Sequence, residues 1–322
     1  MINFVILLAG LVGLWIGTEL IVNGAITLAK RFHLKDAFIG FSILAIGTDL
    51  PEIAVMLDAS IFRTASAESS NIILGSALGS AIGQISIVLG IVGLIGSALI
   101  LRTDIVRYGG VLIAATLLLF VFAFDGLITQ YEGAILIICY VGYFILLLKD
   151  RHHPNNRHHP NISEPLQAPK STFTAWLMVV SGFILLLGSS ELTVNAAISL
   201  AHAFGLSSSS VAVVIIGLGS SLPELSLSGM ALWRKKAGLS IGNLLGSNIL
   251  DTLLVPGIGA VLHPLYAEKD IIWFDMPALL FVTLFALYAL VFSKKGMRKQ
   301  QAVFLILAYG VYIGIRFGRE ML

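Results

Sequence analysis

The sequence predicts an all-α integral membrane protein with ten spanning helices, arranged as two inverted-topology repeats of five. Three observations lead to this fold class: an apolar composition, a series of long apolar runs, and a hexapeptide that occurs once in each half. Of the 322 residues, 57% are hydrophobic and only 12% are charged, and the mean hydropathy is +0.94. Soluble domains carry about twice that fraction of charge, so the composition argues against a soluble core with an anchor.

The apolar runs are long enough to cross a bilayer. They predict spanning helices at 2–29, 37–61, 70–101, 106–125, 130–148, 173–202, 208–233, 239–262, 272–293 and 300–317. The first run has no basic region before it, which indicates a first spanning helix and not a cleaved signal peptide. The single cysteine, Cys139, excludes an internal disulfide.

The basic residues predict the orientation of these helices. With the N-terminus outside, sixteen of the twenty Lys and Arg residues fall on the cytoplasmic side, and only Arg63, Lys269, Arg316 and Arg319 fall outside. Cytoplasmic loops of membrane proteins carry such an excess of positive charge. We therefore expect a multi-pass protein of the cell (inner) membrane with both termini outside.

A polar stretch at 149–172 separates a first repeat, 1–148, from a second, 173–322. It contains a tandem near-copy, RHHPNN at 151–156 followed by RHHPNI at 157–162. Four histidines in eight residues could bind a transition metal weakly. A solvated cytoplasmic linker is the interpretation that we favour.

The two halves are similar in sequence. Residues 19–34 align without gaps to residues 191–206, with ten of sixteen positions identical. The same offset of 172 places Glu52 opposite Glu224, and an offset of 167 places GSALGSAIGQ at 75–84 opposite GNLLGSNILD at 242–251. Because each half has an odd number of predicted helices, the second copy crosses the membrane in the opposite direction. Inverted repeats are typical of transporters with a midplane substrate site, although some channels have them too.

The repeated hexapeptide is GTDLPE at 47–52 and GSSLPE at 219–224. A charged glutamate at the bilayer centre costs roughly 2.5 kcal/mol or more, and a proline inside a helix removes a backbone hydrogen bond. The freed carbonyls, the hydroxyls of Thr48, Ser220 and Ser221, and the two glutamates are hard oxygen ligands. Calcium prefers six to eight such oxygens, and sodium accepts similar ligands. No Cys or His cluster lies at membrane depth, which argues against zinc or copper.

The second repeated motif adds small residues and further oxygens. Gly75 and Gly79, and likewise Gly242 and Gly246, are spaced four apart, which favours close packing of neighbouring helices. The motif also contributes Ser80, Gln84, Ser247 and Asp251 as candidate ligands. Asp49 shares a helical face with Glu52 and completes the candidate set.

With these motifs in opposed orientation, the chain resembles the calcium/cation antiporter superfamily, especially its prokaryotic sodium/calcium exchangers. The resemblance covers nearly the whole chain. It implies four ion sites among helices 2, 3, 7 and 8, with Glu52 and Glu224 as the central calcium ligands, assisted by Thr48 and Ser220. It further implies flanking sodium sites or a water-filled centre lined by Ser80, Ser221, Ser247 and Asp251, and helices 1 and 6 that slide as a gating pair.

The chain departs from the family pattern at three positions. Asp49 replaces a usual serine, Gln84 replaces a usual asparagine, and Ala81 stands where many members have asparagine. Crowded acids raise one another's pKa, so we hypothesise that the coupling differs from that of a sodium/calcium exchanger and involves a proton or another sodium stoichiometry.

The predicted function is therefore exchange of calcium, or a similar divalent cation, for sodium by alternating access. No GxxxxGK[ST] motif for ATP is present in the sequence, so an ion gradient is the expected driving force. We expect no cofactor, no nucleic-acid partner and no enzymatic activity; the partners are the bilayer and inorganic cations. A proton-coupled exchanger is the nearest alternative, a cation channel is a less favoured one, and an intramembrane hydrolase is remote.

Overall fold

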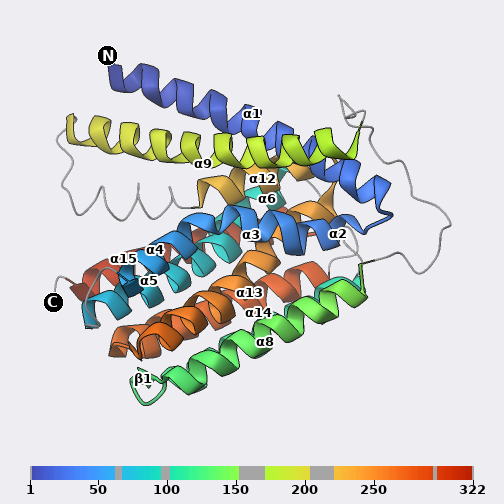
Figure 1. The fold of residues 1–322 in the computed structure, drawn as a ribbon. Coiled ribbons are helices and arrows are strands. Elements are labelled where there is room, and N and C mark those ends of the chain that lie inside the picture. The colour runs from blue at the N-terminus through green and yellow to red at the C-terminus, as the bar shows by residue number, and fades with distance from the viewer. Residues whose placement is uncertain are drawn as a thin grey trace.

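The computed structural model describes residues 2–61, 67–95, 102–151, 171–203, 221–292 and 296–320, and this part of the chain is almost entirely helical (Figure 1). The first half contains a long helix, a broken second segment, and three further segments. These elements are α1 (Ile2–Arg31), α2 (Asp36–Ile39), η1 (Gly40–Leu44), α3 (Ala45–Thr48), α4 (Leu50–Ile61), α5 (Ala67–Gly83), η2 (Gln84–Val88), α6 (Leu89–Ile95), α7 (Arg102–Ala123) and α8 (Gln130–Lys149). The elements named η are π-helical segments.

The second half follows with α9 (Thr172–Ala203), α12 (Leu222–Trp233), α13 (Ala237–Leu262), η4 (Ile271–Asp275), α14 (Met276–Phe292) and α15 (Lys299–Glu320). Two short strands, β1 (Leu127–Ile128) and β2 (Leu265–Tyr266), pair antiparallel. They join the turn between α7 and α8 to the turn after α13.

Seven helices in the described ranges are long and apolar enough to cross a membrane. Each coincides with a predicted span: Asn3–Arg31, Ile73–Ile95, Arg102–Ala123, Gln130–Lys149, Thr172–Leu192, Ala237–Leu262 and Ile271–Phe292. The predicted span 37–61 is broken at Asp49, and the span 208–233 is described only from Ser221 onward. The helical membrane class is confirmed, whereas the count of ten stays a prediction.

Helix α13 runs through the middle of the bundle and packs against α2, η1, α5, α8 and α12. Its glycines allow this, because a Cβ added at Gly242 would lie 2.7 Å from the carbonyl oxygen of Ala37, and one at Gly246 would lie 2.9 Å from the Cα of Phe41. The predicted role of small residues is thus confirmed in α13. In α5 it is not, since no described atom lies within 4 Å of a Cβ built at Gly75 or Gly79.

Helices α1 and α9 lie side by side along one face of the bundle (Figure 1). They approach closely at a pair of glycines: a Cβ added at Gly182 would lie 2.9 Å from the carbonyl oxygen of Gly17. Residues of both helices form a hydrophobic cluster with part of α12. This cluster is distinct from the main core, which α13 shares with α5, α7, α8, α14 and α15.

Ion pairs tie the elements together where α2 begins and α12 ends. Lys236 contacts Asp36 at 3.0 Å, and Arg234 contacts Glu19 of α1 at 2.8 Å. Close by, Lys35 contacts Asp150, the residue that follows α8, at 2.9 Å. These pairs hold the ends of α2, α8, α12 and α13 near one another.

Candidate cation-binding site

The site is built on two helix breaks with the same backbone conformation. Asp49 separates α3 from α4 with φ −86° and ψ 6°, and Ser221 precedes α12 with φ −91° and ψ 6°. Each break is followed by leucine, proline and glutamate. Proline is tolerated there because the first turn of a helix needs no intrahelical N–H donor.

Each motif glutamate therefore lies in the first turn of a helix that begins inside the bundle. Glu52 belongs to the first turn of α4, and Glu224 belongs to the first turn of α12. The partial positive charge at a helix N-terminus stabilises a carboxylate at that position. The proline in the hexapeptide thus helps to place a negative charge at the start of a buried helix.

Three carboxylates come together at these breaks. One oxygen each of Asp49, Glu52 and Glu224 lies within 4.8 Å of the others. The three residues are almost fully buried, with at most 3% of their surface exposed. Buried charges are normally paired or bound to a metal ion, and no described Lys or Arg pairs with them by an ion pair.

Several buried oxygens around this cluster have no hydrogen-bond partner in the described part of the chain. They are both carboxylate oxygens of Asp49, Glu224 and Asp251, together with Oε2 of Glu52 and Oγ of Ser221. Such orphan acceptors are rare in folded proteins and call for an explanation such as an ion or water. A cation that accepts several oxygen ligands, as calcium does, would satisfy them together.

Neutral side chains surround the carboxylates. Ser80 Oγ donates a hydrogen bond to Glu52 Oε1 at 3.3 Å, and Gln84 Nε2 donates to Ser80 Oγ at 2.9 Å. On the other side, Thr48 Oγ1 lies 3.4 Å from Ser247 Oγ. The structure thus places Thr48, Ser80, Gln84 and Ser247 in contact with one another or with the cluster.

The remaining predicted residues either lie farther from the three clustered carboxylates or fall outside the described part of the chain. Asp251 is fully buried in α13, four residues after Ser247, but it is not one of the three carboxylates that lie within 4.8 Å. Ser221 is buried at the second helix break. Ser220, and the histidines of the 149–172 linker, lie outside the described residues.

Two fully buried asparagines in α13 were missed by the sequence reasoning. Asn243 Nδ2 donates to Ser228 Oγ at 3.2 Å, and its Oδ1 lies 3.4 Å from Thr48 Oγ1. Asn248 Nδ2 donates to Gln84 Oε1 at 2.8 Å. The sequence could have indicated them, because both lie inside the repeated motif at 242–251, one directly after Gly242 and the other directly after Ser247. A polar amide in an apolar helix does not contribute to hydrophobic packing and therefore points to another role.

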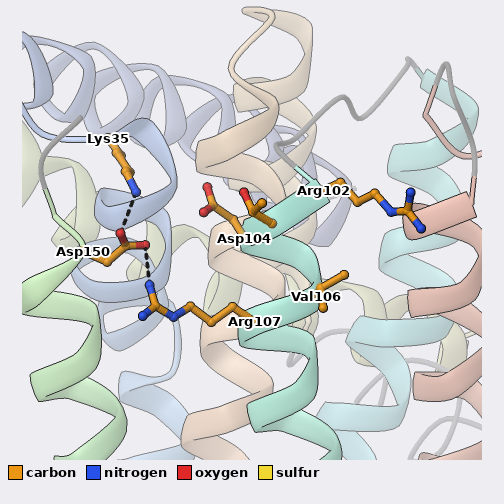
Figure 2. A pocket seen from close by; sticks show the side chains of 7 residues that line it. Lys35, Arg102, Asp104, Val106, Arg107 and Asp150 are labelled. Carbon is orange, nitrogen blue, oxygen red and sulfur yellow. Dashed lines mark hydrogen bonds and ion pairs between the residues drawn. The ribbon is translucent and has the colours of Figure 1, made fainter. Parts of the chain in front are cut away.

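A surface pocket of about 650 Å³ lies beside the start of α7, and Figure 2 shows its lining. Its central carboxylate, Asp150, contacts Lys35 at 2.9 Å and Arg107 at 3.3 Å. Partial burial raises the pKa of Asp150, but the hydrogen bond and charge of Lys35 outweigh burial and lower it below the usual value. Arg102 points to the other side, over the ring of Phe292. None of the clustered carboxylates lines this pocket, so we assign it no part in the candidate site.

Comparison with known families gives one match that covers both halves. The family described as "Sodium/calcium exchanger protein" matches residues 2–149 and 174–318. The two matched ranges exclude most of the predicted linker. They include every candidate ligand.

Individual relatives agree with that match. The chain is 33% identical over 264 residues to the putative antiporter CaxA of Alkalimonas amylolytica, covering 81% of each protein. It is 25% identical over 360 residues to the sodium/calcium exchanger MaX1 of Methanosarcina acetivorans, covering 98% of this chain and 99% of that one. Its structure is similar to that of the sodium-calcium exchanger NCX_Mj, with a TM-score of 0.81, 27% identity and 98% of both chains covered.

Proposed function

The chain belongs to the sodium/calcium exchanger family, and we propose that it exchanges calcium for sodium at the carboxylate cluster of Asp49, Glu52 and Glu224. It is a membrane antiporter of cations and not an enzyme. The observation that carries the proposed site is the meeting of three buried carboxylates at two proline-containing helix breaks. The relatives that are named as exchangers support calcium and sodium as the transported ions.

The full ligand set that we propose combines the carboxylates with the neighbouring hydroxyls and amide. It consists of Thr48, Asp49, Glu52, Ser80, Gln84, Ser220, Ser221, Glu224, Ser247 and Asp251. The unpartnered oxygens of Asp49, Glu224 and Asp251 support this set, because a bound cation would satisfy them. Calcium and sodium compete for the same oxygens, so release of one ion requires binding of the other. That competition couples the two fluxes.

For the whole chain we propose ten spanning helices in two inverted repeats, 1–148 and 173–322, joined by a cytoplasmic linker. The matching backbone of Asp49 and Ser221 supports the repeat. The ion pairs of Lys35, Lys236 and Arg234 support a common side for these basic residues. Both termini then lie outside the cell membrane, and α1 and α9 form the pair that slides across the other helices.

Calcium uptake into proteoliposomes tests the function. Vesicles loaded with sodium are diluted into sodium-free buffer with labelled calcium, and uptake is expected only while the sodium gradient lasts. Glu52→Gln and Glu224→Gln each remove a charged ligand from a buried site and should lower uptake by more than about a hundredfold. Thr116→Val serves as the matched control, because among the described residues the one hydrogen bond of Thr116 Oγ1 goes to Leu112 O within α7.

Two further measurements distinguish sodium/calcium exchange from a proton-coupled exchanger and from a channel. Uptake driven by a proton gradient and indifferent to sodium would replace sodium by protons as the coupling ion. A calcium current without any counter-ion would identify a channel and contradict exchange altogether.

The orientation has its own test. In a Cys139→Ser background, Asn155→Cys in the linker should react with a membrane-impermeant maleimide only when the cytoplasmic face is accessible. Lys269→Cys should react from the opposite face. Labelling of both from the same side would contradict the proposed topology.

A further inference from the structure

A chain of hydrogen bonds leads from α13, in the second repeat, to a carboxylate of the first repeat. Asn248 Nδ2 donates to Gln84 Oε1 at 2.8 Å, and Gln84 Nε2 donates to Ser80 Oγ at 2.9 Å. Ser80 Oγ in turn donates to Glu52 Oε1 at 3.3 Å. All four residues are buried, with at most 5% of any of them exposed, so water does not compete with these bonds.

The direction of this chain follows from the number of protons that each group carries. Asn248 Nδ2 has two, and it donates to Leu244 O at 2.8 Å as well as to Gln84 Oε1. Both acceptors are carbonyl oxygens, which fixes the orientation of the Asn248 amide. The Gln84 amide must then present its Nε2 to Ser80. Because Ser80 Oγ accepts that bond, its single proton is directed to Glu52.

The other half of the site has no equivalent chain. The offset of 167 places Ala81 opposite Asn248 and Asp251 opposite Gln84. Ala81 has no polar side-chain atom, and both carboxylate oxygens of Asp251 lack a partner among the described residues. Glu52 is therefore held by hydrogen bonds that cross from one repeat to the other, whereas Asp251, the position of the second repeat that corresponds to Gln84, has no such hydrogen bonds among the described residues.

The local backbone supports a special role for Gln84. It begins the π-helical segment η2, which interrupts the α-helical pattern between α5 and α6. Such π-bulges occur frequently at functional sites, where they change the direction of a side chain. Here the segment presents the Gln84 side chain to both Ser80 and Asn248.

We propose that Asn248 is a positioning residue for cation exchange, which holds Glu52 in its ion-binding orientation through Gln84 and Ser80. This inference rests on the proposed function, because it assigns a role within the same site. In the described part of the chain no hydrogen bond joins Asn248 directly to the three clustered carboxylates, so its effect on Glu52 passes through Gln84 and Ser80. Asn248 would therefore orient a ligand of the site without contacting the ion itself.

A double-mutant cycle tests the proposal. Asn248→Ala and Gln84→Ala are made singly and together, and the calcium dependence of sodium-driven uptake is measured in proteoliposomes. Each single substitution should raise the KM for calcium about tenfold, the effect of losing one buried hydrogen bond of the chain that holds Glu52, with a smaller change in the maximal rate. The double variant should be no worse than either single one, because both break the same chain.

A matched control uses another buried polar side chain. Thr283 of α14 is fully buried and its Oγ1 has no partner in the described residues. Thr283→Val keeps the shape of the side chain and should leave the KM for calcium unchanged. If Asn248→Ala does not fold, Asn248→Leu keeps a side chain of similar shape without a donor to Gln84 and without a new charge, and it should raise the KM as well.

Either of two results would overturn the inference while leaving the proposed function intact. One is a wild-type KM in the Asn248 variants while Glu52→Gln abolishes uptake. The other is a double variant whose KM rises by the product of the two single effects. Absence of sodium-driven calcium uptake in the wild-type protein would instead overturn the proposed function, and equilibrium binding of labelled calcium to Asn248→Ala would then test the positioning role by itself.

Discussion

At the scale of single residues, the proposed site depends on the carboxylates of the two hexapeptides. The sequence pointed to Glu52 and Glu224 because a charged residue in an apolar run is costly without a function. Because 172 residues separate them, the sequence suggested their proximity only through the inverted repeat and the family resemblance. Asp49 was suggested by its position three residues before Glu52, and its carboxylate does lie with the two glutamates.

Asp49→Ser tests how much this extra acid contributes. Removing one carboxylate from the cluster lowers the negative charge that attracts a divalent ion, so we expect the KM for calcium to rise about tenfold. The measurement is sodium-driven uptake at several pH values and sodium concentrations. Unchanged calcium, sodium and pH dependence would show that Asp49 takes no part in the site, and it would also remove the reason for a different coupling.

At the scale of elements, helix breaks and close contacts at glycines determine how the helices are divided and packed, more than helix propensity does. Apolar length located seven spanning helices, and the proline of the hexapeptide indicated a break within the predicted span at 37–61. The structure divides it at Asp49, since Pro51 favours the start of a new helix. The packing of α1 on α9 also depended on positions, Gly17 and Gly182, that composition alone did not mark.

Two glycines of α9 provide a matched test of that packing. A Cβ at Gly182 would lie 2.7 Å from Ile21 Cγ1 and 2.9 Å from Gly17 O, whereas no described atom lies within 4 Å of one at Gly188. Gly182→Ala should therefore destabilise the protein by about 1–3 kcal/mol through overpacking. Gly188→Ala should be neutral or stabilising by roughly 0.5–1 kcal/mol, because alanine favours a helix. Thermal unfolding in detergent measures both, and equal stability of the two variants would contradict the close approach of α1 and α9.

At the scale of the whole molecule, central α13 and the charged end of the bundle bring distant segments together. Helix α13 supplies Ser247, Asn248 and Asp251, and it packs against elements of both halves. At the bundle end, Asp150 joins Lys35 at the start of α2 to Arg107 of α7. These contacts link residues that are more than 40 positions apart.

The pairing of Asp150 gives a pH-dependent prediction. Its pKa is lowered in the folded protein by Lys35, so its stabilising contribution is present above the usual pKa of about 3.9 and is lost as the pH falls through the lowered value. Asp150→Asn should reduce stability at neutral pH by less than about 1 kcal/mol, since the pair is partly exposed. The difference should shrink as the pH falls below the usual pKa of an aspartate and through the lowered pKa of Asp150. A difference that grows on acidification would contradict this pairing.

The sequence by itself determined the helical membrane class, the similarity between the two halves, and the acidic residues in apolar runs that are candidates for the site, because hydropathy, sequence similarity and residue type are read directly along the chain. It even indicated which residues depart from the family pattern. The tertiary structure decided which of these groups meet: Asp49 with Glu52 and Glu224, and Asn248 with Gln84, Ser80 and Glu52. Such contacts depend on how helices from opposite halves pack around α13, and no spacing along one segment encodes that packing.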